Sequence, residues 1–315
     1  MTASSSTPRA TGASVASPDP LIRSGFATAD DGVRLYWRAV GEGPVLVCNN
    51  GVGVSTYFWR YFVEFFSAHY TVVLWDYRAH GRSDRVADWR TADMSIERLA
   101  KDLRAVINAV AGDAPVVLVG HSMGCQVLFE YYRNHADRVV GLVPMLGSAG
   151  KTLETFFDYS GSPRLFEIAS RVVDQRGAAS HAIMRPLLRS PLAWFITWRF
   201  DLVDPMYARR EDMVKYLGHI SRLDLRVFLH NVLEVQKHDA WDVLPTITVP
   251  TLVVAAERDA FTPMWLSRKI VTTIPGAELL VLADASHAAL IEQPENIHHR
   301  VQRFLEQRIP GFAPR

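Results

Sequence analysis

The chain has 315 residues, of which 49% are hydrophobic and 21% charged, as in a globular protein with an ample core. Its 34 basic and 33 acidic side chains leave a formal net charge of +1, so no nucleic-acid partner is predicted. The two cysteines, Cys48 and Cys125, cannot form a disulfide framework and lack the paired spacing of a zinc site, so no metal site is predicted.

Residues 1–20 are rich in Ser, Thr, Ala and Pro, and we expect them to form a disordered lead. They contain no continuous apolar stretch of the kind that a secretory signal requires. No later apolar run is long enough to span a bilayer, so no transmembrane segment is predicted. Together with the low cysteine count, these features favour a cytoplasmic location.

The chain after the lead begins with three short β-type runs, at residues 26–28, 33–39 and 45–48. Turn-forming residues separate them: Asp30-Asp31-Gly32 and then Gly41-Glu42-Gly43-Pro44. This spacing predicts a hairpin-like start, with antiparallel strands at one edge of a sheet.

Strands then alternate with helices. Further strands are predicted at 71–75, 116–119, 139–146, 251–256 and 278–282, and helices at 96–110, 122–131, 264–274 and 294–307. Continuous apolar runs such as Thr71–Trp75 are typical of central parallel strands buried on both faces. The alternation predicts a doubly wound, mainly parallel α/β sheet of eight strands.

Residues 150–246 interrupt this alternation, because they read as several helices with no strong strand. An insertion of this size between two core strands predicts a helical cap, or lid. The core would then consist of residues 21–149 and 247–315.

The pentapeptide Gly120-His-Ser-Met-Gly124 lies between a buried strand and an apolar helix. In that context G-x-S-x-G places the serine on a sharp strand-to-helix turn, with its hydroxyl clear of the sheet. The two glycines leave room where strand and helix pass closest. The pattern predicts a nucleophilic Ser122, with the backbone N–H of Met123 facing a developing oxyanion. The alternative is an accidental glycine-containing turn.

A serine hydroxyl needs a base within hydrogen-bond reach. Among eleven histidines, His287 is the candidate, because it follows the predicted strand 278–282 at the edge where parallel sheets place reactive groups. His121 is adjacent to the serine, but neighbouring side chains on a tight turn point apart, so we expect it to be structural.

The acid that orients the histidine should also follow a strand. Asp259 meets this condition after the strand 251–256, with Glu257 and Asp284 as rivals. An aspartate in a loop is more often a turn former. Here we expect Thr262-Pro263 to start the next helix unaided, which would leave Asp259 free for the histidine.

A second oxyanion donor is expected in the glycine-rich turn Gly51-Val52-Gly53 after the strand 45–48. The N–H of Val52 is the candidate, because Gly51 lets the backbone bend toward the serine. The alternative is a turn without a catalytic part. A nucleotide loop is disfavoured because neither G-x-G-x-x-G nor G-K-[ST] is present.

Four landmarks act together: Asn50-Gly51, the stretch Asp76-Tyr-Arg-Ala-His-Gly-Arg-Ser-Asp84, the GHSMG turn, and His287 followed by Ala-Ala-Leu-Ile-Glu-Gln-Pro. On these landmarks, residues 25–308 resemble the α/β-hydrolase superfamily, in its branch of serine esterases and cofactor-free haloperoxidases. The order Ser, Asp, His along the chain matches that superfamily. The resemblance implies no cofactor, and a structural role for Asp76 and Arg78 in a turn near the site.

Three positions depart from the family pattern: Asn50, Ala79 and Cys125 replace a common histidine and two glycines. Asn50 weakens any detailed analogy for the oxyanion loop. Relatives that cleave haloalkanes or epoxides carry Asp at the nucleophile position, so a serine there argues against both reactions.

The resemblance implies acyl transfer from a small, apolar ester, lactone or thioester to water. An acyltransferase and a C–C bond hydrolase using the same triad remain open, as does a non-catalytic binding protein. Trp194 and Trp198, four residues apart on one helical face, either pack onto the core or line the acyl pocket. The sequence leaves the oligomeric state undetermined.

Overall fold

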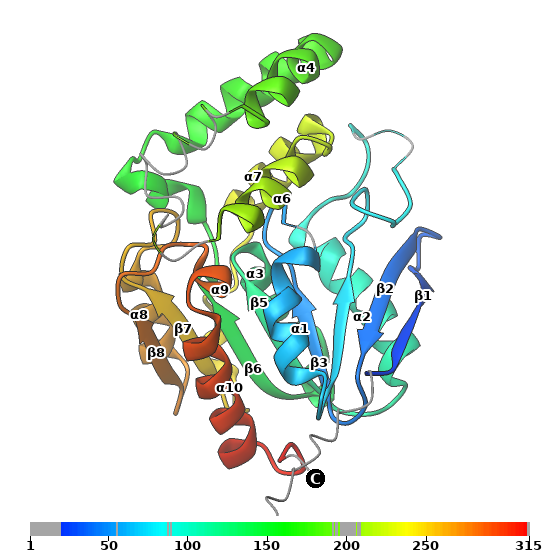
Figure 1. Ribbon diagram of the computed structural model, residues 1–315, viewed down its shortest axis with the longest axis vertical. Helices are drawn as coiled ribbons and strands as arrows, with labels where there is room; N and C mark the ends of the chain where they lie inside the picture. The colour runs from blue at the N-terminus through cyan, green and yellow to red at the C-terminus, as the bar shows by residue number, and fades with distance from the viewer. Residues whose placement is uncertain are drawn as a thin grey trace, which may run out of the picture.

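The computed structural model describes residues 20–54, 56–86, 88, 90–190, 192, 195, 206 and 209–313. The predicted lead, apart from Pro20, and both Trp194 and Trp198 lie outside these residues. Eight strands form one sheet in the order β1-β2-β4-β3-β5-β6-β7-β8 (Figure 1). The strands are β1 (Ile22–Thr28), β2 (Arg34–Val40), β3 (Val45–Asn49), β4 (Thr71–Trp75), β5 (Val116–His121), β6 (Val139–Met145), β7 (Leu252–Ala256) and β8 (Glu278–Leu282).

Strand β2 pairs antiparallel with β1 and β4, and all the other pairs are parallel. The predicted eight-stranded, mainly parallel sheet with an antiparallel edge is therefore confirmed. The apolar runs of β4 and β5 are buried along their whole length, as expected for central strands covered on both faces.

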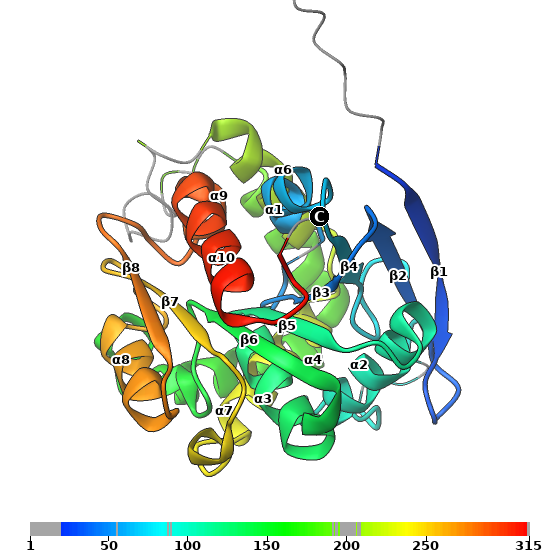
Figure 2. The same ribbon diagram turned by 90° about the horizontal axis from the view of Figure 1, so that it is seen from below.

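Helices cover both faces of the sheet (Figure 2). On one face α1 (Arg60–Phe66), α9 (Ala289–Glu292) and α10 (Pro294–Arg308) pack on one set of strand side chains. On the other face α2 (Ile96–Ala111), α3 (Met123–His135) and α8 (Met264–Thr273) pack on the alternate set. The core is thus divided by the sheet into two apolar layers, which hold the strand ends in fixed positions.

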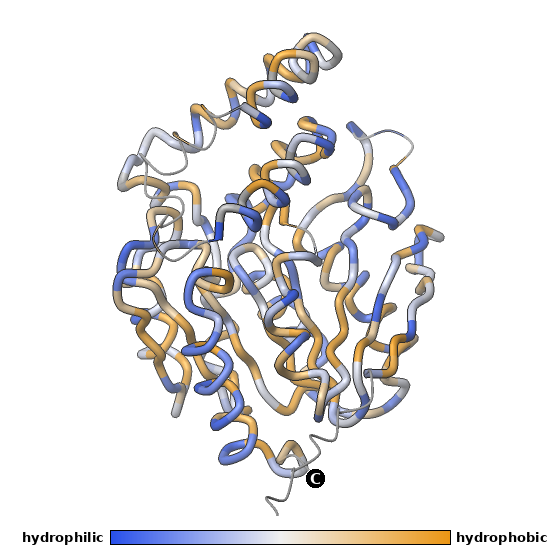
Figure 3. Tube along the Cα trace, in the orientation of Figure 1, coloured by the Kyte–Doolittle hydropathy of each residue, from blue (hydrophilic) through white to orange (hydrophobic). Residues whose placement is uncertain are grey.

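Between β6 and β7 the described residues form helices: η3 (Thr152–Asp158), α4 (Ser162–Leu188), α6 (Arg210–Ile220), α7 (Leu225–Lys237) and η4 (Leu244–Thr246). The predicted helical insertion is confirmed. Figure 1 shows α4, α6 and α7 beyond one end of the sheet, the end at which β5 passes into α3. Figure 3 shows apolar and polar positions alternating along α4 and α7, whereas the central strands are continuously apolar. No helix among the described residues is both long and apolar enough to cross a membrane.

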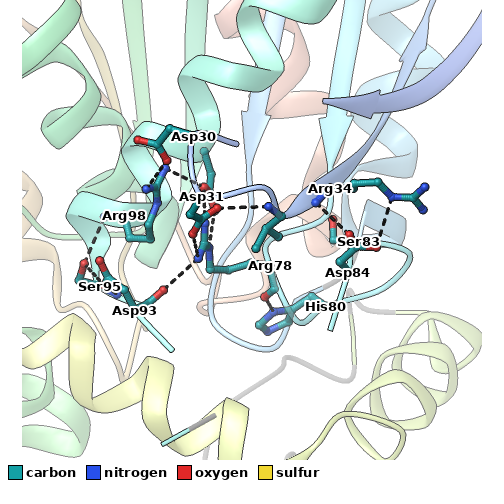
Figure 4. Close-up of polar contacts among 12 residues, drawn as sticks. Asp30, Asp31, Arg34, Arg78, His80, Ser83, Asp84, Asp93, Ser95 and Arg98 are labelled. Atoms are coloured by element: carbon teal, nitrogen blue, oxygen red, sulfur yellow. Dashed lines mark hydrogen bonds and ion pairs between the residues drawn. The ribbon is translucent and has the colours of Figure 1, made fainter. Parts of the chain in front are cut away.

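Arg78 lies in the turn after β4 and is only 2% exposed. Its guanidinium donates two hydrogen bonds of 2.7 Å to the carboxylate of Asp102 on α2. It donates a third, of 2.8 Å, to Asp31 in the β1–β2 turn (Figure 4). Such a bidentate ion pair fixes the relative orientation of the two side chains and also stabilises their contact. The turn that follows β4 is therefore held against both the first hairpin and α2, in line with the structural role that the resemblance implies for Arg78.

Asp76 holds the same turn from inside. Its carboxylate accepts a 2.9 Å hydrogen bond from the backbone N–H of Arg82. Gly81 adopts a positive φ, and a Cβ there would overlap the Asp76 carboxylate, so the turn needs glycine at that position.

Candidate active site

Ser122 stands between β5 and α3 with φ +55° and ψ −119°, a strained conformation for a residue that carries a side chain. Its backbone N–H donates to the carbonyl of Met145 at 3.1 Å. A Cβ on Gly120 would overlap the backbone of Gly124, and one on Gly124 would overlap the carbonyl of Asn49. The close approach predicted for the two glycines is therefore present, and it lets the strand and the helix meet at Ser122.

Ser122 opens into a cavity of about 170 Å³ beneath the helical insertion. Met123, Val52 and His287 line the same cavity, so four of the predicted site residues meet there. None of the described lining residues is Asp, Glu, Lys or Arg. Apolar side chains supply most of the wall: Val54, Phe58, Leu153, Phe156, Phe166, Phe228, Val232, Val235, Phe261 and Ala288.

His287 lies in the loop after β8, and its Nδ1 is 3.0 and 2.9 Å from the two carboxylate oxygens of Asp259. Because a carboxylate accepts hydrogen bonds, the neutral ring carries its proton on Nδ1, and Nε2 is the basic nitrogen. Asp259 lies in the loop after β7, the strand next to β8 in the sheet. The rivals Glu257 and Asp284 are exposed to solvent, and neither lines the cavity.

Asp259 also shapes its own loop. The carboxylate accepts from the N–H groups of Phe261 and Thr262, both at 2.9 Å, and from the Thr262 hydroxyl at 2.8 Å. The expectation that Thr262-Pro263 leaves Asp259 free of a turn-forming role is therefore wrong. An ionised carboxylate has about four acceptor sites, so it can organise the turn and orient the imidazole together. These contacts fix the plane of the carboxylate beside His287.

Ser122 and His287 share the cavity, although no hydrogen bond joins their side chains in the described structure. Such bonds are often long or poorly aligned in unliganded sites and tighten when substrate binds. The arrangement brings together a hydroxyl at the cavity wall, a basic ring nitrogen and a fixed carboxylate. It can therefore support nucleophilic attack on a carbonyl group.

His121 occupies a position that the sequence did not indicate. It lines the cavity, its Nε2 is 3.1 Å from the backbone carbonyl oxygen of His287, and its ring centroid is 5.0 Å from that of His287. Burial, with a smaller contribution from the nearby His287, lowers the pKa of His121 to about 3. The expectation that it is structural agrees with this burial, but its contact with His287 depends on a fold that brings positions 121 and 287 together.

Asn50 braces the turn that carries Val52. Its side-chain amide donates to the carbonyl of Trp75 at 2.9 Å and accepts from the indole N–H of Trp59 at 2.9 Å. The hydroxyl of Tyr77 donates to the Asn50 carbonyl at 2.7 Å. The departure from a common histidine thus preserves a buried polar residue with bonds on both sides. The sequence signal for this bracing role is a polar residue at the end of an apolar strand, just before a glycine.

No group of three His, Cys, Asp or Glu side chains in the described part of the chain is arranged to hold a metal ion. The sheet, the strained serine at a strand-to-helix turn and the His–Asp pair at later strand ends define the α/β-hydrolase class. The sequence pattern of the alpha/beta hydrolase family matches residues 45–299, and the chain belongs to that family.

The chain is similar to RutD of Azorhizobium caulinodans, which carries the name of a carbamate hydrolase. The two are 26% identical over 270 residues, which cover 86% of this chain and 94% of RutD. Among solved structures, an esterase from Rhodococcus sp. ECU1013 has a TM-score of 0.72 at 20% identity, covering 91% of this chain and 99% of the esterase. A bromoperoxidase from Bacillus anthracis has a TM-score of 0.73 at 17% identity, covering 90% and 100%. At such identities the structural likeness shows the shared fold.

Proposed function

We propose that the protein is a serine hydrolase that cleaves carboxylic esters through an acyl-enzyme formed on Ser122. In this proposal His287 is the general base and Asp259 orients it. One observation carries the proposal: the serine and the imidazole line a single apolar cavity, and the Nδ1 of that imidazole is bonded to a buried carboxylate.

In the first half-reaction, the Ser122 hydroxyl oxygen attacks the acyl carbonyl carbon while Nε2 of His287 takes the hydroxyl proton. The carbonyl π electrons move to its oxygen, and the backbone N–H groups of Met123 and Val52 stabilise that oxyanion. When the tetrahedral intermediate collapses, the C–O bond to the alcohol breaks and the imidazolium protonates the departing oxygen. Water then repeats these steps on the acyl-enzyme and releases the acid.

The cavity walls favour an uncharged, apolar acyl group. Removing apolar surface from water contributes roughly 25 cal/mol per Å², whereas a buried charge without a partner is costly. Esters, lactones and thioesters of such acids meet this condition. A small polar carbamate would leave most of the aromatic wall uncovered, so esters are preferred despite the likeness to RutD.

The predicted cap, residues 150–246, would cover the bound acyl group. Phe156 in η3, Phe166 in α4 and Val232 in α7 contribute side chains to the cavity from the insertion. Closing apolar side chains over the serine would exclude bulk water and strengthen the electrostatic contacts inside.

A panel of p-nitrophenyl esters from acetate to palmitate, with a p-nitrophenyl carbamate beside them, tests the proposal on the wild type and on Ser122→Ala. We expect ester hydrolysis by the wild type and a loss of about 10⁴-fold or more in kcat in the variant, with unchanged thermal unfolding. Product analysis with an added alcohol would identify acyl transfer. A folded wild type that is inactive on every ester, or an active Ser122→Ala, would contradict the proposal.

A further inference from the structure

His121 is the last residue of β5 and is 1% exposed. Its Nε2 lies 3.1 Å from the carbonyl oxygen of His287, across 166 positions of the chain. A backbone carbonyl can only accept a hydrogen bond, so Nε2 must carry the proton and Nδ1 the lone pair. The contact therefore selects one tautomer of the ring.

The other ring nitrogen of His121 is enclosed. Nδ1 is buried and makes no hydrogen bond in the described structure. A Cβ on Gly51 would lie 3.0 Å from it, so the backbone of the turn that carries Val52 closes over this nitrogen. A second proton there would be buried without an acceptor, which is costly. The ring is thus a neutral donor of fixed tautomer.

The loop that holds His287 is tied to its surroundings at successive residues. The N–H of Arg258 donates to the Ala285 carbonyl at 3.0 Å, and the N–H of Ser286 donates to the Glu292 carboxylate at 2.8 Å. The next residue, His287, is contacted at its carbonyl by His121 and at its ring by Asp259. Its backbone is therefore held from the end of β5, and its side chain from the loop after β7.

We propose that His121 is a positioning residue, which fixes the backbone of His287 relative to the neighbouring Ser122. This inference rests on the proposed function, because it presumes that His287 acts as the base. In this inference the end of β5 positions both groups. It carries the nucleophile Ser122 directly, and it holds the backbone of the base His287 through the hydrogen bond from His121. Since residues 121 and 122 are adjacent, a shift of the strand end would move serine and imidazole together, and their spacing would be preserved.

Two substitutions at position 121, which introduce side chains of similar length, separate the effect of the hydrogen bond from the effect of packing. In His121→Gln the amide nitrogen can reach the position of Nε2 and donate to the same carbonyl, whereas His121→Met fills similar space without a donor. We expect His121→Gln to keep kcat within about fivefold of the wild type. We expect His121→Met to lose about 10- to 100-fold in kcat with KM nearly unchanged, because misplacement on the order of 1 Å has effects of that size.

The rate at which a fluorophosphonate labels Ser122 should fall with kcat in His121→Met, because that reaction needs the serine and base but no acyl recognition. Thermal unfolding of each variant checks the fold. If His121→Met does not fold, His121→Asn replaces it, since its shorter amide cannot reach the His287 carbonyl.

Equal kcat in the wild type, the Gln variant and the Met variant would overturn the positioning role, and so would equal losses in both variants. An inactive, unlabelled wild type would instead overturn the proposed function. The two failures are therefore distinguishable.

Discussion

The two walls of the cavity are built differently. The core wall carries His121 and Ser122 at the end of β5 and His287 in the loop after β8, and hydrogen bonds hold His287 at both its ring and its backbone. The wall from the insertion presents mainly apolar side chains, such as Phe156, Phe166 and Val232. In the proposed mechanism, the groups that need fixed geometry are held by the sheet, whereas the wall that would meet the acyl group lies on helices that can vary without disturbing them.

This contrast predicts that substitutions in the two walls have different effects on catalysis. Substitutions in the core wall should lower turnover for every ester by the same factor. Substitutions in the insertion wall should change the preference among acyl groups and leave the chemistry of the shortest ester intact.

After Ser122→Ala, the largest effect is expected for Asp259→Asn. The amide N–H would face Nδ1 of His287 and favour the wrong tautomer, so kcat should fall about 10⁴-fold on all esters. Thr262→Val is the matched control, because it removes one hydroxyl contact to the carboxylate and leaves the His–Asp pair in place. Steady-state kinetics on acetate and butyrate esters measures both variants. If Asp259→Asn stayed within tenfold of the wild type, the assigned role of the carboxylate would be wrong.

Asn50→Ala should give the next largest effect, and it should appear in stability. The change leaves the buried indole N–H of Trp59 and the carbonyl of Trp75 without partners, each costing about 1–3 kcal/mol. We therefore expect urea denaturation to show a loss of about 3 kcal/mol in the free energy of unfolding. Asn134→Ala, at an exposed position on α3, should cost within about 0.5 kcal/mol. Similar values for the two variants would deny that Asn50 braces the turn.

Phe166→Ala tests the insertion wall. Removing this ring from the cavity should lower kcat/KM for the preferred longer ester by about 10- to 100-fold and change the acetate value little, since apolar contacts of this size are worth about 1–3 kcal/mol. Leu165→Ala is the control, because its side chain is 56% exposed on the same helix. Equal losses on acetate and on the longer ester would break the proposed division between the two walls.

The smallest effect concerns pH and a histidine outside both walls. His298 on α10 is buried against Phe65, with ring centroids 5.0 Å apart, and burial lowers its pKa to about 4. The unfolded chain, with a histidine pKa near 6.5, binds more protons between these values, so stability should fall as the pH drops from about 6.5 toward 4.

His298→Phe should reduce that slope by about 1 kcal/mol per pH unit below pH 6. Unfolding at pH 8, where the ring is neutral in both states, isolates the change in packing. A slope unchanged by the substitution would show that His298 takes up its proton without unfolding.

The sheet could be predicted because its strands are apolar runs bounded by turn residues. Each run can be recognised from its own residues alone. The proximity of Ser122, Asp259 and His287 could be predicted because each follows a strand, and parallel strands bring their carboxyl ends to one edge. These inferences use only neighbours in sequence together with the topology of the sheet.

The remaining features depend on contacts between distant residues. Nothing near His121 indicates that its ring will meet the carbonyl of His287, and nothing near Asn50 identifies Trp59 and Trp75 as its partners. The sequence predicts that Asp259 contacts the histidine and is free of its own loop, whereas its carboxylate makes both sets of contacts, because one carboxylate has enough acceptor sites for both. Trp194 and Trp198 stay a prediction, since they lie outside the described residues.

Covalent labelling with a fluorophosphonate shows directly whether Ser122 is an activated nucleophile, and it requires no knowledge of the substrate. The tryptic peptide of residues 105–133 contains Ser122 as its single serine, so mass spectrometry can assign the adduct. We expect one adduct on this peptide in the wild type and none in Ser122→Ala. A folded wild type that stays unmodified, or one that is labelled on another peptide, would contradict this expectation.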